Sequence, residues 1–134
     1  MAPGREETIG VHSDEDVVRV RQVTRQWAVE IGFSLVEQTK IVTAASELAR
    51  NTLIHGGGGT AQLQEVEGGG RRGLRLTFED KGPGIADVSQ ALRDGYTTGS
   101  GLGLGLGGAR RLSSTFDITS TPGEGTRVRI TRWR

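Results

Sequence analysis

The chain has 134 residues, of which 34% are hydrophobic and 25% charged, a composition typical of one globular domain. Lysine and arginine number 17 against 16 aspartate and glutamate, so the net charge of +1 lacks the basic excess of a nucleic-acid-binding protein. The absence of cysteine excludes disulfides, thiolate zinc sites and a cysteine nucleophile. The sequence has neither an apolar run near the roughly 18 residues of a membrane span nor an N-terminal signal peptide. We therefore expect a single cytoplasmic domain over residues 1–134, with no membrane or nucleic-acid partner.

The first half of the chain predicts one short strand and two helices. Residues 6–12 are expected to form the strand. Ser13 is followed three residues later by an acidic residue, which is the signature of a helix start, and apolar residues then recur at three- and four-residue steps. Gly32 is a typical helix end. Ser34 begins a second helix by the same pattern, and this helix is expected to end before the glycine run 56–59.

The second half of the chain predicts strands joined by hairpins. Alternating apolar and polar residues predict four strands, over residues 60–67, 74–78, 116–119 and 126–133. Two short helices are expected, over residues 88–93 and 109–112. This order predicts an α+β fold, with a mixed, mostly antiparallel sheet and helices on one face in a two-layer sandwich.

Glu47 and Asn51 lie four residues apart on the second predicted helix, so they share one face. A carboxylate beside an amide oxygen can orient a hydroxyl group and contribute to the coordination of Mg²⁺. The alternative explanation of this pair is a solvated helix face, on which Arg50 simply pairs with Glu47.

Asp80, Gly82 and Gly84 follow the predicted strand 74–78. A carboxylate at the end of a strand can accept a hydrogen bond from an exocyclic amine. The two glycines have no Cβ, so a flat ring can lie against their backbone. The alternative explanation is an ordinary turn that ends the strand.

Residues 95–108 form a glycine-rich segment. Its backbone N–H groups, ahead of a helix, can hold phosphate oxygens. It is not a Walker A loop, because the chain contains no Gly-Lys-Ser/Thr triplet. A Rossmann motif is also excluded, because the preceding residues 96–99 make a poor strand.

Together, the order of these motifs resembles the GHKL ATPase superfamily, whose nucleotide-binding domain has the Bergerat fold. The motifs in chain order are Glu47-x-x-x-Asn51, Asp80-x-Gly82-x-Gly84, Gly99-x-Gly-Leu-Gly-Leu104 and Gly123-x-Gly-Thr126. Within that superfamily, the sequence motifs SELARN at 46–51 and EDKGPGI at 79–85 are similar to those of the RsbT-like switch-protein serine kinases of bacterial partner-switching systems. The run GLGLGLG at 101–107 is more regular than expected of those kinases.

The resemblance implies ATP and Mg²⁺ as cofactors and a catalytic role for Glu47. As general base, Glu47 would activate the serine hydroxyl of a protein substrate, while Asn51 would be the metal ligand. Asp80 would accept a hydrogen bond from the adenine amine. The cofactor-binding residues that the resemblance implies are Asn51, Asp80, Gly82, Gly84, Ile85, Gly99, Gly101, Leu102, Gly103, Leu104, Gly105 and Thr126.

The resemblance also implies protein partners. The substrate would be a STAS-domain antagonist in a stressosome-type pathway, and its phosphorylation would free the kinase to activate a downstream phosphatase or regulator. The alternative is an anti-sigma factor that sequesters a sigma factor and uses kinase activity for release. A third interpretation is an adaptor protein that binds nucleotide without catalysing phosphate transfer. A homodimer is compatible with each interpretation.

Arg127 and Arg129 alternate with Val128 and Ile130 in the last predicted strand. This alternation predicts one buried face and one charged face. We interpret the arginines as charges that protect an edge strand from pairing with other chains. The alternative, a nucleic-acid-binding patch, is disfavoured by the small net charge.

Overall fold

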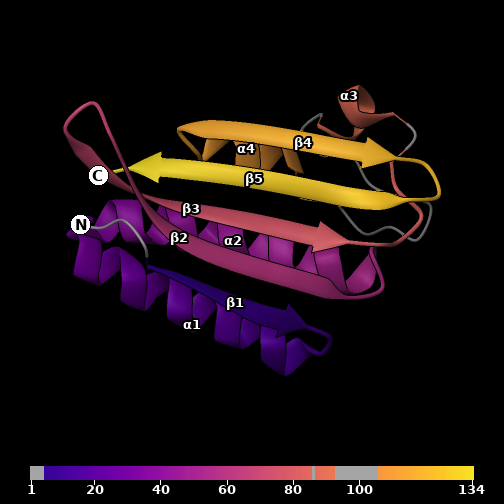
Figure 1. The fold of residues 1–134 in the computed structure, drawn as a ribbon, viewed down its shortest axis with the longest axis horizontal. Helices are drawn as coiled ribbons and strands as arrows, with labels where there is room; N and C mark the ends of the chain where they lie inside the picture. The colour runs from indigo at the N-terminus through magenta and orange to yellow at the C-terminus, as the bar shows by residue number, and fades with distance from the viewer. Residues whose placement is uncertain (1–4, 86, 93–105) are drawn as a thin grey trace.

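The computed structural model describes residues 5–85, 87–92 and 106–134 (Figure 1). The elements in chain order are β1 (Glu6–Val11), α1 (Asp14–Ile31), α2 (Leu35–Ile54), β2 (Gly59–Gly68), β3 (Arg71–Asp80), α3 (Val88–Ala91), α4 (Leu106–Arg111), β4 (Thr115–Thr121) and β5 (Gly125–Trp133). The described strands form one sheet, with α1, α2 and α4 on one side of it (Figure 1). This arrangement confirms the predicted α+β sandwich.

Local capping interactions set the ends of the two long helices. The Ser13 hydroxyl accepts a hydrogen bond from the backbone N–H of Asp16 at 3.2 Å, and the Ser34 hydroxyl accepts one from Glu37 at the same distance. Gly32 ends α1 with a φ of 100°, a left-handed conformation that favours glycine. The helix starts and the first helix end predicted from the sequence are therefore confirmed.

The strand order is β1-β2-β3-β5-β4, and all four described pairings are antiparallel. The mixed component of the expected sheet is therefore absent from the described residues. Hairpins account for the pairs β2–β3 and β4–β5. The interpretation of the last strand as an edge was wrong. β5 lies between β3 and β4, so Arg127 and Arg129 belong to a central strand and their charges do not protect an edge strand.

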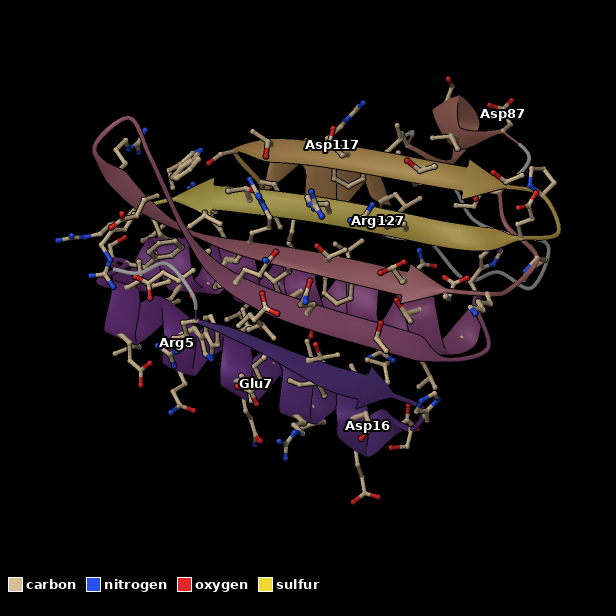
Figure 2. All side chains as sticks on the ribbon, in the orientation of Figure 1. Arg5, Glu7, Asp16, Asp87, Asp117 and Arg127 are labelled. Atoms are coloured by element: carbon tan, nitrogen blue, oxygen red, sulfur yellow. The ribbon has the colours of Figure 1, made fainter. Side chains whose placement is uncertain are left out.

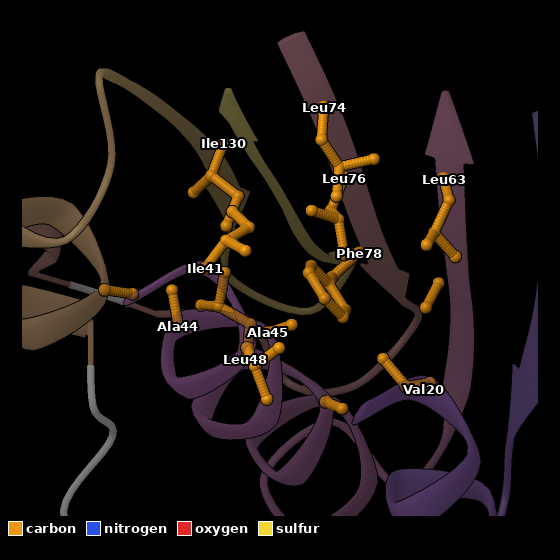
Figure 3. Close-up of a cluster of buried hydrophobic side chains, with 14 of the residues drawn as sticks. Val20, Ile41, Ala44, Ala45, Leu48, Leu63, Leu74, Leu76, Phe78 and Ile130 are labelled. Atoms are coloured by element: carbon orange, nitrogen blue, oxygen red, sulfur yellow. The ribbon is translucent and has the colours of Figure 1, made fainter. Parts of the chain in front are cut away.

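The hydrophobic core lies between the sheet and the helices (Figure 3). Its most buried large side chains come from alternate positions of the strands and from the inner faces of α1 and α2, and they include Val20, Ile41, Leu48, Leu63, Leu74, Leu76, Phe78 and Ile130. Burial of each such side chain stabilises the fold by roughly 2 kcal/mol. Within the described part of the chain, no helix has the length and hydropathy needed to cross a membrane.

Candidate functional site

The first component of the site is the C-terminal half of α2. Glu47 is exposed and Asn51 is half-buried. Neither side chain has a hydrogen bond or ion pair with any described residue, and no ion pair joins Glu47 to Arg50. The Glu47 carboxylate and the Asn51 amide are therefore free to act on a ligand or a partner.

The second component is the end of β3, which the chain brings against the end of α2. The backbone N–H of Gly56 donates a hydrogen bond to the Asn51 carbonyl at 3.1 Å. A Cβ at residue 56 would lie 2.3 Å from Cγ of Asp80, so the aspartate packs directly on the Gly56 backbone. The fold thus places the Asp80 carboxylate beside the helical turn that begins at Asn51.

The Asp80 carboxylate is half-buried and only partly engaged. Its Oδ1 accepts a hydrogen bond from the Gly82 N–H at 2.9 Å, which holds the carboxylate in place. No bond from a described residue reaches Oδ2. An ionised carboxylate accepts several hydrogen bonds, so Asp80 retains the capacity to accept one from an amine.

Gly82 and Gly84 are required by the packing of the chain itself. A Cβ at Gly82 would lie 2.7 Å from the Gly56 carbonyl oxygen, and one at Gly84 would lie 2.4 Å from the Thr121 carbonyl oxygen. Gly84 also has a φ of 77°. The space that we expected a flat ring to use is therefore occupied by backbone, and the binding of adenine by these residues stays a prediction.

Thr126 is buried and is the antiparallel partner of Asp80. Its hydroxyl lies 2.8 Å from the Ser120 hydroxyl, which donates to the Gly125 carbonyl at 3.2 Å. One of the two hydroxyls therefore donates to the other, and this bond ties Thr126 to Ser120. The Ser120 oxygen also accepts from the N–H of Ile85 at 2.7 Å.

Sequence reasoning missed Ser120 and Gly125. Ser120 joins the segment after β3 to the β4–β5 hairpin through its hydrogen bonds. Gly125 has a φ of 116°, and a Cβ at this position would lie 2.1 Å from the Asp80 carbonyl oxygen. The motif Gly-x-Gly-Thr contains Gly125 and was a signal for it. No local signal marks Ser120, because its contact with Thr126 depends on the pairing of β4 with β5.

Six of the predicted residues fall outside the described part of the chain. They are Gly99, Gly101, Leu102, Gly103, Leu104 and Gly105. The described chain resumes with α4, whose Leu106 and Ala109 are fully buried in the core. Ile85 is also buried in that core, at the segment that follows Asp80.

The free oxygens of the site fit a nucleotide with Mg²⁺. The described residues contain no cluster of three or more histidine or acidic side chains that could hold a metal ion. Mg²⁺ does not need such a cluster, because it usually takes one or two protein ligands with substrate phosphates and water. The unpartnered Asn51 amide oxygen suits one such position, and Asp80 suits an amine donor.

Comparisons with known proteins show which family the chain is similar to. Residues 11–132 match the histidine kinase-like ATPase domain. The chain is 41% identical over 125 residues to the serine/threonine-protein kinase RsbT of Bacillus subtilis, covering 93% of this chain and 94% of RsbT. It is 30% identical over 118 residues to the anti-sigma F factor of Thermoanaerobacter sp. strain X514, covering 84% of this chain and 82% of that factor.

The fold is also similar to a solved structure. The crystal structure of the RsbU and RsbW domains of Rv1364c from Mycobacterium tuberculosis matches with a TM-score of 0.66 and 24% identity. The match covers 98% of this chain and 33% of that one. At this identity the likeness concerns the fold alone.

Proposed function

The chain belongs to the histidine kinase-like ATPase family and is similar within it to RsbT, and we infer that it is a cytoplasmic, ATP- and Mg²⁺-dependent protein serine/threonine kinase. The identity of 41% to RsbT, over nearly the whole of both chains, carries this inference. The unpartnered side chains of Glu47 and Asn51 support it, because a phosphotransfer site needs a free base and a free metal ligand.

Glu47 is proposed as the general base of phosphoryl transfer. Its exposed carboxylate would accept the proton of the attacking serine hydroxyl and hold that hydroxyl in line with the γ-phosphate. Asn51, one turn along the same face of α2, would bind Mg²⁺. The metal ion would neutralise the charge that develops on the phosphate oxygens.

Asp80 and Thr126 are proposed to recognise the adenine ring. The Gly82 N–H fixes Asp80 and leaves Oδ2 for an exocyclic amine. Thr126 is the antiparallel partner of Asp80, so its side chain lies at the same end of the sheet. The glycines of 99–105 are proposed to contact the phosphates, as the sequence resemblance implies.

The proposed substrate is a serine in a STAS-domain antagonist protein of a stressosome-type pathway. Phosphorylation of this antagonist would weaken its hold on the kinase. The released kinase would then bind and activate a downstream phosphatase or regulator.

A second candidate function is supported by the 30% identity to an anti-sigma F factor. In that case the chain would sequester a sigma factor, and its kinase activity would control release. Purified sigma factor and purified STAS-domain protein, offered separately to the immobilised chain, distinguish the two functions. Retention of sigma factor would favour the second.

Transfer of labelled phosphate from ATP to a purified STAS-domain protein encoded in the same genome tests the kinase function. We expect the wild-type chain to label the STAS-domain protein, and Glu47→Gln to reduce the rate by about 100-fold or more through loss of the base. Glu67→Gln, at an exposed position near the end of β2, is the matched control and should retain the wild-type rate. ATP binding without transfer by the wild-type chain would contradict the kinase function.

A further inference from the structure

The face of the sheet that is turned away from α1, α2 and α4 carries guanidinium groups held in fixed positions. The Nε of Arg129 donates a hydrogen bond to the Thr77 hydroxyl at 3.3 Å, and the Nε of Arg75 donates one to the Thr131 hydroxyl at 3.1 Å. Both threonines are almost fully buried, with exposed fractions of 3% and 1%. The two arginines are therefore half-buried and lie along the surface of the sheet.

The outer nitrogens of these arginines remain available. The Nη atoms of Arg75 and Arg129 have no hydrogen bond or ion pair with described residues. Arg127 is exposed and likewise has no bonding partner in the described chain. Fixed guanidinium groups with free donors lose little side-chain entropy when a carboxylate binds them.

A hollow of about 250 Å³ lies among Asp117, Thr119, Arg127 and Arg129 on this face. Asp117 stands opposite Arg129 in the pairing of β4 with β5, and Thr119 stands opposite Arg127. Figure 2 shows Asp117 and Arg127 on the side of the sheet away from the helices. The hollow therefore offers two guanidinium groups, one hydroxyl and one carboxylate to a partner.

We propose that this face, defined by Arg75, Asp117, Thr119, Arg127 and Arg129 and here called the arginine face, docks a carboxylate-bearing surface of a partner protein. The charges favour a protein over a nucleic acid. Asp117 and, next to Arg127 on β3, Glu79 would repel a run of phosphates, while a protein surface of mixed charge can offer a cation to them.

The arginine face fits the downstream regulator and not the protein that receives the phosphate. Glu47 and Asn51 are on α2, on the opposite side of the sheet, so a protein bound to the arginine face leaves them uncovered (Figure 1). The accepting serine must instead reach the helix side. This assignment rests on the proposed partner-switching kinase function.

The test uses the full chain, a purified downstream phosphatase or regulator encoded in the same genome, and the STAS-domain protein. The variant R127Q/R129Q removes two charges from the arginine face, and R19Q/R71Q removes two exposed charges elsewhere. We expect R127Q/R129Q to weaken binding of the regulator about tenfold or more, with STAS phosphorylation within about twofold of wild type. The control should change neither quantity, and wild-type binding should weaken as salt is added.

A second variant separates charge from orientation. Thr77→Val removes the acceptor that holds Arg129 and keeps every charge. We expect regulator binding to weaken about threefold, because the freed guanidinium must be ordered on binding. Thermal unfolding confirms that each variant is folded before its affinity is compared.

Regulator binding that is unchanged in R127Q/R129Q, or absent in the wild-type chain, overturns the proposal. Loss of STAS phosphorylation in that variant also overturns it, because the face would then serve the substrate. Binding of a 20-base-pair DNA duplex in place of the regulator would reassign the face to nucleic acid. A wild-type chain that binds the regulator through the arginine face but phosphorylates no STAS-domain protein would instead contradict the kinase function alone.

Discussion

Gly56 and Asp80 are in direct contact, although 24 positions separate them in the sequence: a Cβ at residue 56 would lie 2.3 Å from Cγ of Asp80 and 2.5 Å from its Oδ2. The contact joins the end of α2, which carries Glu47 and Asn51, to the end of β3. It fixes how the proposed catalytic helix is placed relative to the proposed adenine acceptor.

Gly56→Ala should displace the Asp80 carboxylate, because the added methyl group has no space. We expect destabilisation by about 1–3 kcal/mol and a loss of ATP affinity of about tenfold or more. Urea unfolding and titration with a fluorescent ATP analogue measure the two effects. Gly10→Ala, in β1, is the control, because a Cβ there would meet only the exposed His12 side chain, at 3.3 Å. ATP affinity equal to wild type in Gly56→Ala would contradict the proposed role of the contact.

Asp80→Asn should keep the hydrogen bond from the Gly82 N–H, since the amide oxygen can take the place of Oδ1. The charged acceptor for the adenine amine is lost, and a charged hydrogen bond contributes about 1.5–3 kcal/mol. We therefore expect ATP to bind about 10- to 150-fold more weakly, with little change in unfolding free energy. Calorimetric titration measures the affinity, and a variant that binds ATP as tightly as wild type would remove Asp80 from the nucleotide site.

Ser120→Ala should leave the Ile85 N–H without its acceptor and the Thr126 hydroxyl without its partner. An unsatisfied buried donor costs about 1–3 kcal/mol, so the urea midpoint should fall accordingly. Ser120→Thr keeps the hydroxyl and is expected to retain most of the stability. Equal midpoints for Ser120→Ala and wild type would show that water replaces the serine oxygen.

Ser13→Ala should destabilise the chain by about 1 kcal/mol, because the Asp16 N–H loses its side-chain acceptor at the start of α1. Ser13→Asp restores an acceptor and should recover that stability. Far-ultraviolet circular dichroism during urea unfolding measures both variants. Ser89→Ala, at an exposed position in α3, is the control. Ser114 does not suit this purpose, because its hydroxyl accepts a hydrogen bond from the Trp133 N–H.

The sequence alone determined the features that depend on nearby residues. Ser13 and Ser34 accept bonds from residues three positions ahead, so their helix starts were readable from the sequence. The spacing of Glu47 and Asn51 places them on one helix face in any fold that contains that helix. The motif order was sufficient to identify the superfamily, which the comparisons then showed.

The tertiary structure decided what depends on residues far apart in the chain. Alternation of Arg127 and Arg129 with apolar residues predicted a charged face. Only the strand order shows that β5 lies between two other strands, and only the paired strands bring Arg129 to Thr77. Likewise, the sequence predicted that Gly82 leaves space for a ligand, but in the structure the backbone of Gly56 occupies that space. Helix caps form within a few residues, whereas strand order and backbone contacts depend on which distant segments pair, and that is settled only when the whole core packs.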